Sequence, residues 1–391
     1  MRSYRYLIVG GGMTADAACR GIRERDPDGS IGLVGEERHP PYNRPPLSKG
    51  LWKGKDENSI WRETAALEVE FHLGRRVVAL DLSECRATDD QGEIYSYERL
   101  LLATGGRPRR LAIGGDDVVY FRTLDDYRRL SQAEAGHVVV IGGGFIGSEI
   151  AAALASNGWR VSLVFPEDGI GSRLFPPELA AFLVDFYRSR GVQVLPGETV
   201  TGVDRLGGGI EVLTGSGALP EASCVVAGLG IEPSVDLAVA AGLPTANGIM
   251  VDDRGRVAGR EDVFAAGDVA RFPAKLLATD LRVEHEDHAN SHGAHVGRNM
   301  AGADEPYDHL PFFYSDLFDL GYEAVGEVDS RHSTLVEWVE PNRKGVVSYL
   351  DREGRPRGFL LWDVWGKVDA ARQLIRSGVP LSGDSLRQLI G

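Results

Sequence analysis

Cysteine is scarce in this sequence, and its placement excludes two kinds of site. The 391 residues contain three cysteines, Cys19, Cys85 and Cys224, which lie far apart along the chain. No C-x-x-C pair occurs, so the chain has neither the redox-active dithiol of a disulfide reductase nor the cysteine pairs of a zinc ribbon. Few, unpaired cysteines fit a reducing compartment, and we expect a cytoplasmic protein.

Positive charge and long apolar runs are also lacking. The formal net charge of −14 argues against nucleic acids and anionic membranes as main partners. The most apolar stretch, 138–155, is interrupted by glycines, Ser148 and Glu149, and it is too short to span a bilayer. Because Met1–Tyr4 lead directly into an apolar strand, we expect no signal peptide. The length and the 26% of charged residues indicate a folded chain of two or three domains.

An internal repeat is the most informative feature that is present. In its first copy, the apolar strand Tyr6–Val9 leads into a glycine-rich turn, 10–15, and then into a helix to about Arg25. A second strand, Ile31–Val34, follows, and the acidic residue Glu36 stands just after it. Strands that alternate with helices in this way predict parallel β/α units.

The same order recurs in the middle of the chain. Its elements are the strand Val138–Ile141, the turn 142–147, the helix Glu149–Ser156, the strand Val161–Val164 and the acid Glu167. The acid follows the first glycine of the turn at almost the same interval in both copies. One such unit occurs in many unrelated α/β proteins, whereas two complete copies predict two dinucleotide-binding units.

Each turn has the G-x-G-x-x-G/A form, whose positions have separate physical tasks. The first glycine makes the tight turn, the second lets a pyrophosphate approach the backbone, and the third small residue lets helix and strand pack. The helix N-terminus then faces the phosphates, and the acid accepts hydrogen bonds from ribose hydroxyls. These positions are Gly10, Gly12, Ala15 and Glu36 in the first copy and Gly142, Gly144, Gly147 and Glu167 in the second.

Beyond Pro311 the pattern changes to short strands joined by glycine, proline and aspartate turns. The expected elements are the strands Tyr322–Val328, Thr334–Val339, Val346–Leu350 and Gly358–Val364 and the helix Val368–Ser377. Here Trp362 and Trp365 suit a hydrophobic core better than a ligand site. The expected fold is therefore α/β, with two Rossmann-like dinucleotide-binding domains and a C-terminal α+β domain that contains an antiparallel sheet.

Five short motifs give the chain a resemblance to a known family. They are Pro41–Lys49, Leu101–Gly105, Val263–Asp268, Val283–Ala289 and Ser315–Leu317. With these motifs the chain resembles, over nearly its whole length, the FAD- and NAD(P)-dependent pyridine nucleotide-disulfide oxidoreductase-like proteins that include bacterial ferredoxin reductases, rubredoxin reductase and apoptosis-inducing factor. The last two motifs look closest to apoptosis-inducing factor.

The resemblance implies which unit takes which cofactor. The N-terminal unit would hold FAD, and the inserted middle unit would hold the nicotinamide cofactor. The implied domains are an FAD-binding domain of residues 1–115 and 245–310, an NAD-binding domain of residues 116–244 and a C-terminal domain of residues 311–391. The implied FAD residues are Gly10, Gly12, Ala15 and Glu36 at the adenosine end and Arg44, Lys49, Thr104 and Asp268 along the rest. The implied NAD residues are Gly142, Gly144, Gly147 and Glu167.

Asp268 is also a candidate on physical grounds. An apolar strand from Phe264 ends in Gly267 and this carboxylate, which can accept hydrogen bonds from ribityl or ribose hydroxyls. The alternative is that Asp268 caps the next helix.

Three residues are candidates for tuning the flavin. The resemblance places Lys49 beside the N5 edge of the flavin, paired with Glu149, where a desolvated ammonium would stabilise negative charge on reduced flavin. The alternative is a surface lysine and a helix-capping glutamate that never meet. The aromatic that matches Phe145 in apoptosis-inducing factor lies near the flavin and moves when nicotinamide stacks, although Phe145 could equally pack its own helix. Tyr314 stands where relatives have a tryptophan near the flavin.

Four histidines, His285, His288, His292 and His295, fall on one helical face. Such a row would suit a metal, but no other ligands accompany it, and we expect no metal site. We instead expect Glu284 and His285 to begin a helix whose positive end points at the flavin pyrimidine edge. The alternative is an ordinary polar helix start.

The expected activity is that of an NADH-dependent flavoprotein reductase. Glu167 favours NADH because a carboxylate would repel the extra phosphate of NADPH, although it follows Phe165-Pro166 rather than a regular strand end. Without a dithiol, electrons must leave the flavin directly, toward a ferredoxin, a rubredoxin or a quinone. The alternative is a redox sensor like apoptosis-inducing factor, with a long-lived complex of reduced flavin and NAD⁺ and a homodimer that forms on reduction.

A docking surface for an acidic acceptor would need a local basic patch. The candidates are Arg107, Arg109 and Arg110, with Arg122, Arg128 and Arg129 further along the chain. The alternative, an ordinary solvated face, is slightly preferred.

Overall fold

The computed structural model describes residues 1–390, which form two units built from interleaved segments. The first unit consists of Met1–Arg44, Asp56–Arg107 and Glu232–Pro311. The second consists of Pro45–Lys55, Pro108–Ile231 and the chain from Phe312 onward. The predicted NAD-binding and C-terminal segments thus fall mostly within a single unit, and the three-domain division stays a prediction. Gly391, with which the predicted C-terminal domain ends, lies outside the described residues.

A seven-stranded sheet forms the centre of the first unit, in the order β3-β2-β1-β6-β5-β4 with β18 paired to β6. Its strands are β1 (Arg2–Val9), β2 (Ile31–Gly35), β3 (Val69–Leu73), β4 (Val77–Asp81), β5 (Arg86–Asp89), β6 (Ile94–Leu102) and β18 (Val263–Ala265). Strands β3, β2, β1, β6 and β18 are parallel, whereas β4 and β5 pair antiparallel. The two strands predicted for the first copy of the repeat are confirmed as β1 and β2.

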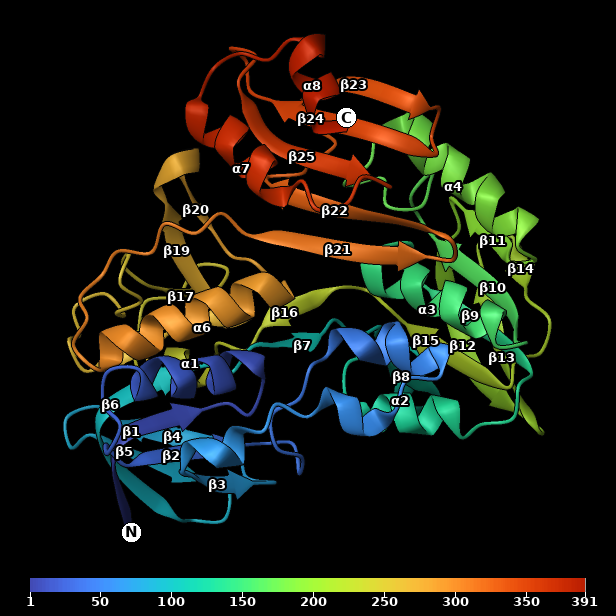
Figure 1. The fold of residues 1–391 in the computed structure, drawn as a ribbon. Helices are drawn as coiled ribbons and strands as arrows, with labels where there is room; N and C mark the ends of the chain where they lie inside the picture. The colour runs from blue at the N-terminus through green and yellow to red at the C-terminus, as the bar shows by residue number, and fades with distance from the viewer. Residues whose placement is uncertain (391) are drawn as a thin grey trace. The chain divides into compact units, whose positions relative to one another are not determined.

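Alternation along β1 separates the two faces of this sheet. Leu7 and Val9 belong to one hydrophobic cluster, and Tyr6 and Ile8 belong to the other. The second cluster is covered by helices α1 (Met13–Arg23) and α6 (Glu286–Met300), which lie side by side although they come from opposite ends of the unit (Figure 1). They approach so closely that a Cβ on Gly21 would lie 2.0 Å from the Ala294 carbonyl oxygen.

The remaining elements of the first unit are short. They are helix α5 (Asp236–Ala240) and the three-stranded sheet β17 (Ile249–Met250), β19 (Ala270–Ala274) and β20 (Thr279–Leu281). Strands β7 (Gly106–Pro108) and β16 (Ile231–Pro233) pair at the points where the chain passes from one unit to the other.

The second unit contains a wholly parallel sheet, ordered β11-β10-β9-β15-β8. Its strands are β8 (Val118–Tyr120), β9 (His137–Ile141), β10 (Arg160–Phe165), β11 (Gln193–Pro196) and β15 (Cys224–Ala227). Its helices are α2 (Leu124–Ser131), α3 (Phe145–Ser156) and α4 (Pro177–Ser189), and β12 (Val200–Leu206), β13 (Gly209–Thr214) and β14 (Gly217–Ala218) form a small antiparallel sheet. The predicted helix of the second copy begins earlier than expected, at Phe145, directly after the turn.

The C-terminal part of this unit is an antiparallel sheet, ordered β21-β22-β25-β24-β23, with two helices packed against it (Figure 1). The elements are β21 (Phe312–Leu317), β22 (Leu320–Gly326), β23 (Ser333–Glu340), β24 (Lys344–Leu350), β25 (Pro356–Trp362), α7 (Val368–Ser377) and α8 (Gly383–Ile390). The predicted strands and the first helix are confirmed. Strand β21 and helix α8 were not expected.

Strand β21 could not be predicted from the sequence, because the hairpin that follows it lacks the usual turn residues. Leu317 pairs with Leu320, so only Phe318 and Asp319 form the turn. Phe318 adopts a φ of 60°, a left-handed conformation in which glycine or asparagine is the usual residue. Of the two tryptophans assigned to the core, Trp362 is fully buried, but Trp365 is 49% exposed, so its assignment is wrong.

Within the described part of the chain, every helix is too short or too polar to serve as a membrane span.

Candidate functional site

The first glycine-rich turn has the geometry that its sequence predicts. Gly10 follows β1 with a φ of +131°, and a Cβ there would lie 2.1 Å from the Ala103 carbonyl oxygen, so only glycine fits. Gly12 is the N-cap of α1, and a Cβ on it would meet no atom within 4 Å. Ala15 is fully buried between helix and sheet. The backbone amides at the start of α1 are therefore open to a phosphate, as a bound dinucleotide requires.

The second turn repeats this arrangement in the other unit. Gly142 has a φ of +110°, and its Cβ would lie 2.5 Å from the Gly228 carbonyl oxygen. A Cβ on Gly147 would lie 1.8 Å from the carbonyl oxygen of Gly142, whereas one on Gly144, the N-cap of α3, would meet nothing within 4 Å. The turn is thus tightly packed at its first and third glycines and open at its second.

Gly144→Ala is expected to fold normally, keep its FAD and raise the KM for NADH by about tenfold or more, because the methyl group fills the space for the pyrophosphate. Steady-state kinetics and the flavin content of the purified variant measure both effects. A KM equal to that of the wild type would place NADH elsewhere. Gly147→Ala is the contrasting variant, since its methyl group would strike the backbone and should impair folding.

The two predicted acids stand just beyond the ends of β2 and β10. Glu36 is exposed, and Glu167 is 34% exposed. The guanidinium of Arg173 lies 3.5 Å from the Glu167 carboxylate and is itself 88% exposed. Phe165 is the last residue of β10 and is fully buried. Its ring would lie 2.7 Å from a Cβ on Gly143. The segment before Glu167 is therefore packed directly under the turn.

The structure brings Arg44 and Asp268 toward the same region of the first unit. The guanidinium of Arg44 pairs with the carboxylate of Glu37 and donates to the hydroxyl of Tyr42 at 3.0 Å. Burial lowers the pKa of Arg44, but the electrostatic effects of Tyr42, Glu37 and Asp268 outweigh burial, so the pKa is raised above the ordinary value.

Asp268 lies in a single 3₁₀ turn, Gly267–Val269, that follows β18. Strand β19 follows directly, so the alternative in which Asp268 caps a helix is wrong. Gly267 has a φ of +73°, and a Cβ on it would lie 2.2 Å from the Thr14 hydroxyl in the first turn of α1. Asp268 is thereby held close to the first glycine-rich turn. The Thr104 hydroxyl, also predicted at FAD, donates to the Ser234 carbonyl oxygen at 2.8 Å.

Helix α6 begins where the sequence predicts, with His285 as its N-cap. Desolvation lowers the pKa of His285 to about 4, so the side chain is neutral at neutral pH. Glu284 pairs with Arg282 at 2.6 Å. The orientation of this helix end toward a flavin stays a prediction.

The other three histidines of α6 pack and do not form a ligand set. Among residues 1–390, no group of three His, Cys, Asp or Glu side chains could hold a metal ion. His292 Nδ1 accepts a hydrogen bond from the Gly267 amide at 3.3 Å, and the rings of His288 and His292 lie 4.7 Å apart. His292 thus stabilises the turn Gly267–Val269, which contains Asp268.

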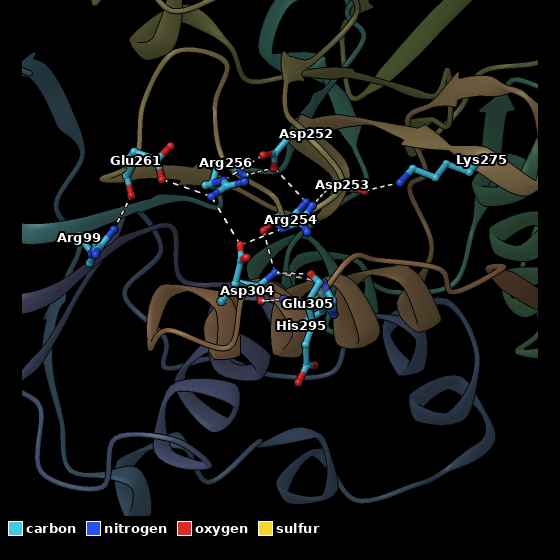
Figure 2. A network of polar contacts seen from close by, with 11 residues as sticks. Arg99, Asp252, Asp253, Arg254, Arg256, Glu261, Lys275, His295, Asp304 and Glu305 are labelled. Atoms are coloured by element: carbon cyan, nitrogen blue, oxygen red, sulfur yellow. Dashed lines mark hydrogen bonds and ion pairs between the residues drawn. The ribbon is translucent and has the colours of Figure 1, made fainter.

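At the far end of α6, His295 borders a network of ion pairs (Figure 2). Its Nε2 bonds to the carbonyl oxygen of Glu305 at 2.8 Å. Asp304, the preceding residue, pairs with Arg254 at 2.8 Å and with Arg256 at 3.5 Å. The contacts tie the segment after α6 to the loop before β18. They are partly exposed, so each stabilises the fold little by itself.

Acidification is expected to destabilise the first unit. Burial lowers the pKa of His292 from 6.5 to about 3 in the folded protein. Below pH 6.5 the unfolded chain therefore binds a proton that the folded chain does not, and stability falls by about 1.4 kcal/mol per pH unit until about pH 3. His292→Asn keeps an acceptor for the Gly267 amide but does not titrate. Urea unfolding between pH 7 and pH 5 should show a shallower pH dependence in this variant, and an equal slope would contradict the assignment.

The second unit contains a buried lysine–glutamate pair, and the predicted partners do meet. Glu149 lies in the first turns of α3, is 4% exposed, and has its Oε1 2.6 Å from Lys49 Nζ. The ammonium of Lys49 lies 5.4 Å from the centre of the Tyr314 ring, which is 37% exposed. Phe145 packs edge-on against Phe313 at 5.0 Å, so in this structure it makes a packing contact.

Two serines that the sequence did not single out complete this cluster. Ser48 Oγ donates to Glu149 Oε2 and Ser315 Oγ donates to Glu149 Oε1, each at 2.6 Å. Both stand beside a predicted residue, Lys49 or Tyr314, within the motifs that carry the family resemblance. That adjacency is the only signal in the sequence that could have indicated them.

A chain with two open dinucleotide turns, one in each unit, and no redox dithiol has the features of a flavin- and nicotinamide-dependent oxidoreductase. Comparison with family models agrees with this class. Residues 4–293 match the pyridine nucleotide-disulphide oxidoreductase model, and residues 296–343 match the C-terminal model of mitochondrion-associated apoptosis-inducing factor. The chain therefore belongs to the pyridine nucleotide-disulphide oxidoreductase family.

Curated relatives cover nearly the whole chain. It is 33% identical to apoptosis-inducing factor 1, mitochondrial, of Dictyostelium discoideum, over 96% of this chain and 79% of the relative. It is also 33% identical to the ferredoxin–NAD(+) reductase component of the anthranilate 1,2-dioxygenase system of Burkholderia cepacia, over 95% and 94%. Monodehydroascorbate reductase 3 of Arabidopsis thaliana is 32% identical, over 83% and 81%.

Solved structures agree on the fold and the class. Putidaredoxin reductase in its covalent complex with putidaredoxin has a TM-score of 0.90 and 29% identity, over 100% of this chain and 96% of that one. A ferredoxin reductase from Rhodopseudomonas palustris gives the same score and identity, over 100% and 98%. The predicted fold class is thus confirmed, and the chain is an NAD(P)H-dependent flavoprotein reductase of the ferredoxin-reductase type. Binding of FAD and a pyridine nucleotide is expected for this family.

Proposed function

We propose that this chain passes electrons from NADH through FAD to a separate electron acceptor, with a small ferredoxin or rubredoxin as the first choice and a quinone as the second. The observation that carries the proposal is the buried Lys49–Glu149 pair in a chain without a C-x-x-C dithiol. The names of the Burkholderia cepacia relative and of both structural neighbours support a protein acceptor. Because all three cysteines are free thiols, we also propose a cytoplasmic location.

The residues of this chain would divide the work as follows. FAD, when bound, accepts the two electrons of a hydride and can release them singly. Gly12 and Gly144 would admit the two pyrophosphates, and Asp268 would accept hydrogen bonds from hydroxyls of FAD. Lys49 would supply a fixed positive charge that favours reduced flavin, and Glu149 would hold that charge in place.

An anaerobic titration with NADH tests this function. Reduction of the flavin absorbance by one equivalent of NADH, followed by rapid reoxidation with a [2Fe–2S] ferredoxin, a rubredoxin or a short-chain quinone, would support the proposal and identify the acceptor class. A purified protein with a flavin that NADH does not reduce would refute it.

A redox sensor is the second candidate, and the apoptosis-inducing-factor match over residues 296–343 favours it. In that case the reduced protein would keep a long-wavelength charge-transfer band in air, and sedimentation would show a monomer becoming a homodimer after NADH is added. Rapid turnover with an acceptor and a mass that does not change on reduction would exclude the sensor.

The proposed preference for NADH depends on the carboxylate of Glu167. Glu167→Gln removes the charge that would repel the 2′-phosphate of NADPH, and Arg173, 3.5 Å away, would then be available to pair with that phosphate. We expect the ratio of kcat/KM for NADH over NADPH to fall by about tenfold. Asp168→Asn, which neutralises the next, exposed carboxylate, is the matched control and should change the ratio little. An unchanged ratio in Glu167→Gln would assign specificity to another residue.

The predicted basic patch gives little support to a docking site. Arg107 pairs with the carboxylates of Glu232 and Asp236, and Arg128 lies 3.7 Å from Asp125. Two of the patch's six arginines are therefore balanced by neighbouring acids.

A further inference from the structure

The carboxylate of Glu149 receives more hydrogen bonds than its pairing with Lys49 requires. Its Oε1 is 2.6 Å from both Lys49 Nζ and Ser315 Oγ, and its Oε2 is 2.6 Å from Ser48 Oγ. Hydroxyl donors at this distance from a carboxylate make short, charge-assisted hydrogen bonds. Both serines are buried, Ser48 at 6% exposure and Ser315 at 0%, so water does not compete with them.

Three separate segments of the second unit meet at this one carboxylate. Ser48 ends the 3₁₀ turn η1 (Pro45–Ser48), Glu149 belongs to α3, and Ser315 belongs to β21. The turn is held firmly, because Trp52 donates its indole N–H to the carbonyl oxygen of Leu47 at 2.8 Å. The two hydroxyls therefore approach Glu149 from fixed backbones on different elements.

The two hydroxyls determine how many oxygens of the Glu149 carboxylate can bind the ammonium of Lys49. A buried carboxylate must be both neutralised and fully hydrogen-bonded to be tolerated. With Ser48 on Oε2, the carboxylate cannot turn to bind the ammonium of Lys49 through both oxygens. Lys49 then uses one of its three N–H bonds on Glu149 and keeps two for other partners, whereas pairing through both oxygens would leave it one.

The other groups around the pair do not neutralise the Glu149 carboxylate, although the Tyr322 hydroxyl also hydrogen-bonds the Ser315 side chain. Burial, and then the charge of Glu149, raise the pKa of both Tyr187 and Tyr322 well above the ordinary value, so these phenols stay neutral. Tyr187 donates its hydroxyl to the Ser148 carbonyl oxygen at 3.1 Å. On the same strand as Ser315, Asp316 pairs with Lys53 at 2.9 Å. Lys49 is therefore the cation that pairs with the Glu149 carboxylate.

We propose that Ser48 and Ser315 are positioning residues that fix the orientation of the Glu149 carboxylate and thereby aim the ammonium of Lys49. The proposal rests on the proposed function, in which Lys49 favours reduced FAD. Removal of either hydroxyl would let the carboxylate turn toward Lys49 and withdraw positive charge from the flavin.

The test is the midpoint potential of the bound flavin, measured with dithionite and redox dyes in the full-length protein. Ser48→Ala and Ser315→Ala should each shift the potential to more negative values and slow flavin reduction by NADH about tenfold, the effect of one hydrogen bond to a charged group. The double variant should show less than the sum of the two effects, because the hydroxyls share one carboxylate. Ser315→Thr, which keeps the hydroxyl, should restore most of the potential.

Ser148→Ala is the matched control. Ser148 is also buried and precedes Glu149, but its hydroxyl donates to the carbonyl oxygens of Gly144 and Phe145. The midpoint potential of the flavin in Ser148→Ala should equal that of the wild type. Wild-type potentials in both Ser48→Ala and Ser315→Ala would overturn the inference. Because dithionite reduces the flavin without NADH, a failure of NADH to reduce the wild type would count against the proposed function separately.

Discussion

A chain that carries Gly12→Ala is expected to fold normally and to bind FAD about a hundredfold more weakly, or to be purified without it. Gly12 has a φ of −97° and a ψ of −167°, an extended conformation that alanine adopts without strain, and its Cβ would meet no protein atom within 4 Å. The new methyl group would therefore occupy only the space above the N-terminus of α1. In a dinucleotide site that space belongs to the pyrophosphate, and a loss of about 3 kcal/mol corresponds to a factor of about one hundred.

Gly10→Ala is the contrasting variant, which shows how loss of folding differs from loss of FAD binding. Its methyl group would lie 2.1 Å from the Ala103 carbonyl oxygen at a φ of +131°, so this variant should be insoluble or unfolded. Circular dichroism and thermal unfolding of the apoproteins report on the fold, and fluorescence titration with FAD reports on the affinity. Wild-type FAD content in a folded Gly12→Ala protein would show that FAD does not bind at the first turn.

The glycine-rich turns could be predicted from the sequence because their geometry is local. A residue at a φ of +131° or +110° must be glycine, and the next strand and helix follow at a fixed interval, so the pattern is visible along the chain. The row of histidines at helical spacing likewise led to a helix expected to begin at Glu284 and His285, and His285 is the N-cap of α6. Strand β21 was not predicted, because the turn after it contains Phe318 in a left-handed conformation that phenylalanine rarely adopts.

The buried contacts could not be predicted in this way, because their partners are far apart in sequence. The pairing of Lys49 with Glu149 was expected only from family resemblance, and nothing in the spacing of Ser48, Glu149 and Ser315 indicates that they meet. A comparable contact in the first unit, between Asp16 and Arg62, was not expected. Asp16 stands between two alanines in the first turns of α1, and its complete burial can be known only from the fold.

Arg62 joins three segments of the first unit. Its Nε donates to Asp16 Oδ2 of α1 at 2.7 Å, its Nη1 to Asn43 Oδ1 at 2.7 Å, and its Nη2 to Asn290 Oδ1 of α6 at 2.8 Å. Asn43 precedes Arg44, and α1 and α6 begin at the first turn and at His285. The guanidinium is 13% exposed and the Asp16 carboxylate is fully buried, so water reaches neither easily.

Arg62→Ala is expected to destabilise the first unit by about 3–5 kcal/mol, because it leaves the buried Asp16 carboxylate without its main counter-charge. The Thr64 hydroxyl, which donates to Asp16 Oδ1 at 2.6 Å, is neutral and cannot replace that charge. Urea unfolding of the FAD-loaded protein, followed by release of flavin fluorescence, measures the loss. Hydrogen exchange should show the same weakening in the amides of α1 and α6.

Arg20→Ala is the control that makes this prediction specific, because Arg20 contacts the same carboxylate. Its Nε and Nη2 donate to Asp16 Oδ2 and Oδ1 at 2.9 and 3.2 Å, but the side chain is 45% exposed and screened by water, so its removal should cost clearly less than that of Arg62. Combining Arg62→Met with Asp16→Asn removes both charges and should recover most of the stability lost in Arg62→Ala. Equal destabilisation by Arg20→Ala and Arg62→Ala would contradict the prediction. The loss in Arg62→Ala could then not be attributed to the burial of the Arg62–Asp16 pair.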